Sequence, residues 1–319
     1  MIKSVAMIVV PNFSIFEFAT AFEVFGIDRS ARGSGVPAFD FRVCAPEPGD
    51  IPLKSGLSMH VGLGLEAAAD ADLVVMAPYG RDQDVPESVL DALRAAHARG
   101  AWVMSICSGA FALARAGLLD GRRCTTHWHY SQELASTYPA VLVDENVLYV
   151  EDGRIITSAG TAAGIDASLH LIRVEFGAKV AAAIARDMVV PPHRDGGQAQ
   201  YIDRPIPQCG SEPMEQLLQW MVRHLDEEHP VNELAARVHM SPRTFARRFR
   251  SETGATPAAW LNSQRVLRAQ ELLETTELNI DEVARESGFG HSVLLRHHFA
   301  KALDTSPQSY RRTFRGHLA

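Results

Sequence analysis

The C-terminal third of the sequence contains the same helical pattern twice, and this repeat limits the folds available to it. The stretch ELAARVHMSPRTFARRF (233–249) matches EVARESGFGHSVLLRHHF (282–299), at an offset of 49 residues in its first part and 50 in its second. Each copy predicts a short helix with a small inward-facing alanine, a tight turn, and a second helix with apolar residues four positions apart. The repeat therefore predicts two helix-turn-helix units within an all-α segment, with one residue inserted in the second turn.

The turns of the two copies carry residues that suit their positions. Ser241 followed by Pro242 predicts an N-cap and a first helical residue. In the second copy, Gly288 provides the backbone freedom that a tight turn needs, and Ser292 is expected to cap the following helix. A helix predicted over 258–273, about 24 Å long, separates the units. Such a spacer suits two recognition helices that lie about one DNA turn apart, roughly 34–36 Å.

The distribution of charge agrees with a nucleic-acid-binding tail. The chain has a formal net charge of −7, yet residues 213–319 hold 14 basic and 13 acidic residues, which leaves 17 basic and 25 acidic residues elsewhere. Five arginines and no acidic residue lie between positions 237 and 250. This pattern suits neutralisation of phosphates and recognition of guanine. The alternative is an all-α packing domain with a charged surface.

With these motifs, the last hundred residues resemble the DNA-binding domain of the AraC/XylS family of transcriptional regulators, and residues 288–314 are close to that family's signature. The resemblance implies double-stranded DNA as a partner, with RNA polymerase as a further one. It also implies a set of groove-facing side chains: Arg243, Ala246, Arg247 and Arg250 in the first unit, and Ser292, Val293, Arg296 and His297 in the second. Because His297 stands where many members carry arginine, we expect the second unit to read bases more weakly or to contribute mainly phosphate contacts.

The first 190 residues alternate short apolar runs with longer amphipathic segments. Three runs predict buried strands, at 5–10, 72–77 and 102–106, and three segments predict helices, at 17–25, 86–99 and 109–116. This alternation predicts a parallel sheet covered by helices on both faces. The dipeptide Asp152-Gly153 predicts a hairpin between strands at 147–151 and 154–158, and a helix is expected over 162–176.

A change of composition predicts the domain boundary. Residues 191–213 contain five prolines and three glycines and show no apolar periodicity. We interpret this stretch as a linker between an α/β domain at 1–190 and a helical domain at 214–319.

The stretch WVMSICSGA (102–110) leads from a predicted strand into a helix through Cys107. A side chain at such a turn is expected to project into solvent. The following helix N-terminus offers free N–H groups and a partial positive charge, which lower a thiol's pKa and bind an oxyanion or a carboxylate. Glu17 follows the first strand and is expected at the same carboxyl edge of the sheet. With His127, these residues predict a nucleophilic constellation, whereas the alternative for Cys107 is a small buried hydrophobic residue.

On the Glu17 acid, the SICSG elbow and the THW segment, this half resembles the PfpI-like group of the class I glutamine amidotransferase-like superfamily. The resemblance implies a flavodoxin-like α/β sandwich and a homodimer formed through it. It also implies a ligand pocket, for which the candidates are Glu17, Gly80, Cys107, Ser108, Gly109 and His127. Family peptidases carry His after the Cys where this chain has Ser108, which argues against peptidase or amidotransferase chemistry and leaves hydratase-like chemistry open. Joined to an AraC-type domain, the chain looks like the subfamily in which this fold is a sensor.

The leading hypothesis is therefore a transcriptional regulator that responds to a small metabolite, one with a carboxylate or another polar nitrogenous group. The ligand would act by binding two arrangements of the protein with different affinity. One alternative is an enzyme in which Cys107 performs covalent chemistry, and another is redox sensing through the same thiol.

Other classes of protein are not expected. Cys44, Cys124 and Cys209 are interpreted as reduced thiols without a CxxC pair, and the histidine pairs 127/129 and 297/298 lack further ligands, so we expect no metal and no cofactor. The sequence has no run of about 18 apolar residues, and the apolar stretch 4–10 ends at a proline after strand length. We therefore expect a cytoplasmic protein that does not engage a membrane.

Overall fold

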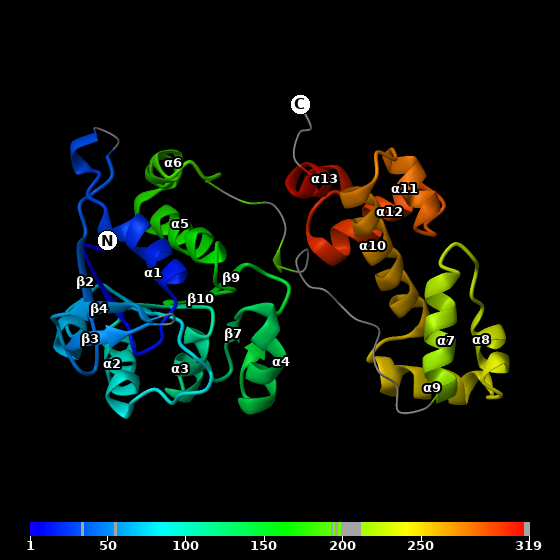
Figure 1. Cartoon of the computed structure of the whole chain (residues 1–319), viewed down its shortest axis with the longest axis horizontal. Coiled ribbons are helices and arrows are strands. Elements are labelled where there is room, and N and C mark those ends of the chain that lie inside the picture. The colour runs from blue at the N-terminus through cyan, green and yellow to red at the C-terminus, as the bar shows by residue number, and fades with distance from the viewer. Residues whose placement is uncertain (33–34, 54–55, 193, 195–196, 199–211, 316–319) are drawn as a thin grey trace. The chain divides into compact units, whose positions relative to one another are not determined.

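A computed structural model describes residues 1–32, 35–53, 56–192, 194, 197–198 and 212–315 (Figure 1). The chain divides into two compact units, Met1–Arg194 and Asp195–Ala319. Most of the linker predicted at 191–213 lies outside the described residues. At its start, Arg194 Nε donates to both carboxylate oxygens of Asp166 at 3.0 Å, which joins this residue to the first unit.

The first unit is built on a six-stranded sheet in the order β2-β1-β5-β6-β10-β9. The strands are β1 (Ser4–Ile8), β2 (Asp40–Cys44), β5 (Leu73–Met76), β6 (Trp102–Ile106), β9 (Tyr149–Asp152) and β10 (Ile155–Ser158). All neighbours pair in parallel except β9, which runs antiparallel to β10 through the predicted Asp152-Gly153 hairpin. Counted along the chain, the parallel strands are ordered 2-1-3-4-5, which is the flavodoxin-like arrangement. The fold class and the strands expected at 5–10, 72–77 and 102–106 are confirmed.

Helices cover both faces of this sheet, so its central strands are buried on both sides and mostly apolar. One face carries α1 (Ile15–Ala21), α5 (Ala163–Phe176) and α6 (Ala178–Asp187), and the other carries α2 (Glu87–Ala98), α3 (Gly109–Arg115) and α4 (Trp128–Thr137) (Figure 1). The helix predicted over 17–25 begins at Ile15 and ends in a π-helical turn, η1 (Phe22–Gly26). Two hydrophobic cores result, one on each face of the sheet.

Smaller elements connect these layers. The strands β3 (Gly49–Pro52) and β4 (Ser58–Val61) form an antiparallel pair, and β7 (Arg123–Cys124) pairs in parallel with β8 (Leu142–Val143). Two 3-10 turns, η2 (Ser30–Arg32) and η4 (Leu65–Ala68), complete the unit.

The second unit is helical throughout its described part. Its helices are α7 (Glu212–Arg223), α8 (Val231–Arg237), α9 (Pro242–Thr253), α10 (Pro257–Thr275), α11 (Ile280–Glu286), α12 (Ser292–Leu303) and α13 (Pro307–Arg315). The pairs α8–α9 and α11–α12 are the two predicted helix-turn-helix units, and the second turn is one residue longer. None of the helices in the described ranges has the length and apolar composition needed to cross a membrane.

The caps of these helices are partly those expected. The Ser241 hydroxyl accepts the Thr244 N–H at 3.3 Å, and Pro242 opens α9. The cap predicted at Ser292 is wrong, because Ser292 is already the first residue of α12 and His291 precedes it without a side-chain capping bond. In the second helix-turn-helix motif, the capped helix is instead the first one, α11. There the Asn279 side chain accepts the Glu282 N–H at 3.0 Å, while the Glu282 carboxylate accepts the Asn279 N–H at 2.7 Å.

Candidate DNA-binding surface and ligand pocket

The second helix of the first helix-turn-helix motif, α9, has a buried side and a charged side. It occupies the place of the recognition helix in such motifs. Phe245 and Phe249 are fully buried in the core with α7, α8 and α10. Arg243, Arg247 and Arg250 are exposed, at the helical spacing that places them on one face. No ion pair joins these three arginines to a carboxylate in the described part of the chain. Their charges are therefore available to an external anion.

Two neighbouring residues of α9 differ from this exposed set. The predicted contact residue Ala246 lies between the arginines and is half-buried. Arg248 is engaged, because its Nε donates to Glu252 Oε1 at 2.7 Å.

The recognition helix of the second helix-turn-helix motif, α12, buries apolar residues at the same spacing as α9 but exposes different side chains. Leu295 and Phe299 are fully buried. Among the predicted contact residues Arg296 and His297 are exposed, Ser292 is half-buried, and Val293 is 72% exposed. The structure thus exposes most of the side chains predicted to face DNA in both units.

A single helix, α10, fixes the two helix-turn-helix motifs relative to each other within the second unit. Its first half, including Trp260, packs into the core of the first helix-turn-helix motif. Its second half, including Leu273, packs into the core of the second motif. Arg265, in the middle of α10, donates from Nε to the carbonyl of Leu225 at 2.8 Å. At 19 residues, α10 is about 28 Å long. The two recognition helices are therefore held by one continuous spacer.

In the first unit, Cys107 occupies the predicted elbow between β6 and α3. Its φ is +52°, in the left-handed region that non-glycine residues rarely adopt, which marks local strain. Gly160 lies against it so closely that a Cβ at this position would stand 2.3 Å from the Cys107 Cβ. The expectation that the side chain projects into solvent is wrong: Cys107 is only 8% exposed, because the chain around Gly160 covers it.

The electrostatics of this thiol also differ from the expectation. Burial and then the negative charge of Glu17 raise the pKa of the Cys107 thiol to about 12, although the N–H groups of Ser108 and His127 lower it. The helix terminus supplies the predicted N–H donors, but desolvation has the larger effect. The low-pKa, exposed thiol required by the redox hypothesis is therefore not present in this structure.

Glu17 is a buried carboxylate, 6% exposed, that faces the same region. One oxygen accepts the Thr161 N–H at 3.3 Å, and the other accepts the Ser14 hydroxyl. These bonds fix the carboxylate at the carboxyl edge of the sheet. The edge position expected for Glu17 is confirmed.

Ser108 connects the elbow to the loop after β5. Its hydroxyl accepts the Tyr79 N–H at 3.0 Å and donates to the Tyr79 carbonyl at 2.7 Å. Both residues are buried, so this two-point contact satisfies the backbone of a loop that would otherwise lack partners.

A cavity of about 440 Å³ opens at this edge, between the loops that follow β1, β5 and β6. Four of the six pocket candidates line it: Glu17, Gly80, Cys107 and Ser108. Sequence reasoning missed its aromatic walls, which are Phe13, Phe16, Tyr79 and Tyr130. They come from loops and helix starts, where no periodic pattern marks them.

The other two candidates, Gly109 and His127, do not line this cavity. A Cβ on Gly109 would stand 2.6 Å from the Met76 carbonyl, so this glycine permits close packing of α3 on β5. The His127 ring accepts the His129 N–H through Nδ1 at 3.2 Å, and burial lowers its pKa. His127 contributes its backbone N–H to Cys107, whereas its ring does not line the cavity that Glu17 and Cys107 share.

The two other cysteines in the described ranges do not line this cavity. Cys44 and Cys124 are fully buried, as expected, and burial raises the pKa of each to about 12. Cys209 lies outside the described residues. Across the described ranges, His, Cys, Asp and Glu side chains form no group of three that could hold a metal ion.

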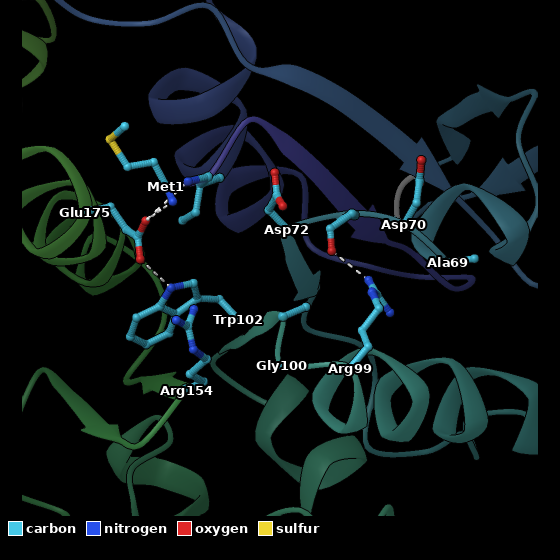
Figure 2. Close-up of a pocket in the computed structure, with 12 residues that line it drawn as sticks. Met1, Ala69, Asp70, Asp72, Arg99, Gly100, Trp102, Arg154 and Glu175 are labelled. Atoms are coloured by element: carbon cyan, nitrogen blue, oxygen red, sulfur yellow. Dashed lines mark hydrogen bonds and ion pairs between the residues drawn. The ribbon is translucent and has the colours of Figure 1, made fainter.

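A second hollow, of about 410 Å³, lies at the opposite edge, where the parallel strands begin (Figure 2). Glu175 lies in its wall: one oxygen accepts the Trp102 indole N–H at 2.8 Å, and the other pairs with the amino group of Met1 at 3.4 Å. The Arg154 guanidinium lies 5.2 Å from the centre of the Trp102 ring. These groups tie the start of β1 to α5 and β6. The hollow at the carboxyl edge is thus the better candidate for a ligand, since ligands of such sheets bind there.

Comparisons with known proteins agree with this division. Residues 3–174 match the model of the DJ-1/PfpI family, and residues 234–313 match the model of a helix-turn-helix domain. The HTH-type transcriptional regulator GlxA of Rhizobium meliloti is 28% identical over 324 residues, which cover 98% of this chain and 96% of GlxA. The isonitrile hydratase of Pseudomonas putida is 38% identical over 106 residues, 33% of this chain and 45% of the hydratase.

One solved structure shows the fold of the first unit. The crystal structure of an AraC family transcriptional regulator from Pseudomonas putida superposes with a TM-score of 0.51 at 22% identity. The match covers 58% of this chain and 99% of that one.

Proposed function

The chain belongs to the DJ-1/PfpI family and carries a helix-turn-helix domain, and on this basis we propose that it is a transcriptional regulator controlled by a small metabolite. It binds double-stranded DNA through α9 and α12, and the cavity beside Cys107 receives the metabolite. Because it acts on DNA, it works in the compartment that holds the chromosome.

One observation carries the DNA-binding part of this proposal. Three exposed arginines share one face of α9, and none of them pairs with a carboxylate among the residues that the structure describes. The helix α10 joins this helix-turn-helix to the second one. Clustered free cations on a recognition helix are what phosphate neutralisation and guanine recognition require.

The cavity indicates the chemistry of the metabolite. Glu17 presents a fixed, buried carboxylate at its wall, while aromatic rings from Phe13 and Tyr130 form much of the rest. A second carboxylate would be repelled by Glu17, whereas a nitrogen that donates hydrogen bonds or carries positive charge would be attracted. Of the two ligand classes suggested by the sequence, the nitrogenous one is therefore favoured.

The metabolite would change transcription by favouring one arrangement of the DNA-binding units over another. We further propose that the first unit forms a homodimer, which would give paired operator sites, and that the bound regulator acts on RNA polymerase. Apolar side chains that are exposed on the first unit and do not line the cavity, among them Leu142 at 56% and Val174 at 49%, support a protein contact there.

A second candidate function is an enzyme that uses Cys107 as a nucleophile. The strained elbow and the N–H groups of Ser108 and His127 favour it. The raised pKa of Cys107 argues against it, because the thiol is not ionised at neutral pH. The His127 ring also does not line the cavity that would hold the substrate.

The experiment that tests DNA binding is selection of duplexes from a random library by the full-length protein. We expect wild type to enrich a defined sequence, and the double variant Arg243→Ala/Arg247→Ala to enrich none. Arg223→Ala is the matched control, since Arg223 is an exposed cation on α7 outside both helix-turn-helix units. The proposal fails if wild type enriches no sequence or if the control loses selectivity to the same extent.

The metabolite and enzyme proposals are separated by a second experiment. A thermal-shift screen of the full chain should find a nitrogenous metabolite that raises the melting temperature of wild type but not of Glu17→Gln. Turnover of candidate amides, isonitriles and α-oxoaldehydes is then measured for wild type and Cys107→Ala. Turnover that disappears in Cys107→Ala while the DNA response persists would establish the enzyme instead.

A further inference from the structure

The two recognition helices present different chemistry at equivalent positions. The buried residues Phe249 of α9 and Phe299 of α12 align the helices at the repeat offset of 50. At this offset the outward arginine positions of α9 hold other residues in α12: Val293 for Arg243, His297 for Arg247 and Ala300 for Arg250. The second helix therefore carries no arginine at the three positions that hold outward arginines in the first.

Val293 is the position where this difference is greatest. Its side chain is 72% exposed, and that of the adjacent Leu294 is 49% exposed, although α12 has a buried side that fills the core. In the corresponding place, Arg243 presents a charge. An exposed valine on a recognition helix stabilises a complex only if an apolar group covers it and removes its surface from water.

The floor of the major groove offers one apolar group, the 5-methyl of thymine. We propose that Val293 packs on a thymine methyl, so that α12 reads its part of the operator by apolar contact while α9 reads its part through arginine. This inference rests on the proposed function, because it presumes that α12 enters the groove.

The charges around Val293 are compatible with this role. Arg296, which stands at the position of Ala246 in the first unit, is exposed and provides a cation beside the valine. It can hold α12 against the phosphates while Val293 reaches the base edge. In the first helix-turn-helix motif, arginines would serve both phosphates and bases. In the second, Arg296 would contact phosphates while Val293 contacts a base.

The test is a thymine scan of the operator selected by the full-length protein. Each thymine is replaced in turn by deoxyuracil, which removes only the methyl, and dissociation constants are measured for wild type and Val293→Ala. For wild type we expect one position, or two adjacent ones, on one side of the site where the replacement weakens binding about fourfold, the effect of one buried methyl. At the same position, Val293→Ala should bind thymine and deoxyuracil within about a factor of 1.5.

Val231→Ala is the matched control, since Val231 is an exposed valine at the start of α8 and outside the recognition helices. It should keep the thymine preference of wild type. The inference is overturned if no position loses affinity with deoxyuracil, or if Val293→Ala retains the wild-type preference at every sensitive position. A selected operator with no thymine on the α12 side would overturn it as well. Failure of the selection itself would contradict the proposed function rather than this contact.

Discussion

Gly288 lies directly against the backbone carbonyl of Leu225, so closely that a Cβ on the glycine would stand 2.0 Å from the oxygen. The same carbonyl accepts the Nε–H of Arg265 at 2.8 Å. The turn of the second helix-turn-helix therefore contacts the chain that follows α7, beside the middle of α10. This contact, together with the packing of α10 into both cores, holds the two helix-turn-helix motifs at a fixed separation.

Gly288→Ala should destabilise the helical unit strongly. The φ of +86° disfavours any side chain, and the added methyl would also overlap the Leu225 carbonyl. We expect a loss of about 3 kcal/mol or more, measured by hydrogen exchange of residues 212–315. Gly290→Ala is the control: its φ is +72°, yet nothing lies within 4 Å of the Cβ, so strain alone should cost about 1 kcal/mol. Equal losses in the two variants would show that the contact is unimportant.

Ser108→Ala should destabilise the first unit by about 1–3 kcal/mol, because it leaves the buried N–H and carbonyl of Tyr79 without their partner. Urea unfolding of the full chain, followed by hydrogen exchange in residues 1–192, measures the loss. Ser136→Ala removes an exposed hydroxyl bond on α4 and should change the free energy of unfolding by less than about 0.5 kcal/mol. A Ser108→Ala variant as stable as this control would contradict the prediction.

Alkylation of Cys107 should be slow at neutral pH and should keep rising in alkaline solution. With a pKa of about 12, the folded thiol stays protonated, so its rate should grow about tenfold per pH unit between pH 7 and 10 without a plateau. Glu17→Gln removes the negative charge that raises the pKa, so alkylation should become faster at every pH. Peptide mass spectrometry after iodoacetamide treatment measures the rate, and the urea-unfolded chain serves as the reference. A plateau below pH 9 in the folded protein would contradict the buried thiol.

The same pKa has a consequence for stability. Because the folded pKa lies above the ordinary value, the native state holds its proton longer than the unfolded chain does. The contribution of Cys107 to stability is complete below the ordinary thiol pKa and is lost as the pH rises toward about 12.

Arg247→Ala should relax the sequence preference of the protein and cost about 1–3 kcal/mol at one base pair if Arg247 forms a bidentate bond with guanine. Binding to the selected operator and to operators altered at single positions measures the change. A uniform loss on all duplexes, with a smaller salt dependence, would place Arg247 on a phosphate instead.

A fragment that ends at Arg194 tests the proposed division of the chain. It contains both hydrophobic cores of the α/β unit, so it should fold and show the same ligand-induced thermal shift as the full chain. It lacks both recognition helices and should not bind the selected operator. Specific binding by the fragment would overturn the assignment of DNA binding to the second unit.

Elements defined by local patterns were predictable from the sequence. The strands β1, β5 and β6 are buried on both faces and so carry continuous apolar runs, and the recognition helices carry their apolar residues at helical spacing. In contrast β2, with the sequence DFRVC, is a half-buried edge strand with charged residues and gave no such signal. Neither α4 nor α6 was predicted, although α6 places Ala181, Ile184 and Ala185 at the helical spacing of a buried face.

The candidate pocket was predictable only in part. The elbow at Cys107 follows from a strand that leads into small residues, and its strained backbone is present. Its burial depends on Gly160, which is far along the chain and is brought there by the pairing of β10 with β6. A distant segment of this kind reverses a pKa expectation that was based on the helix terminus alone.

Because α10 is continuous, the residues that select the DNA sequence are separate from the residues that set the distance between the two recognition helices. The side chains that would distinguish one operator from another lie on the outer faces of α9 and α12, whereas the interval between them is set by a core in which those side chains take no part. Substitutions on the outer face of one recognition helix can therefore change half of the target sequence. The distance between the two halves of the target stays constant.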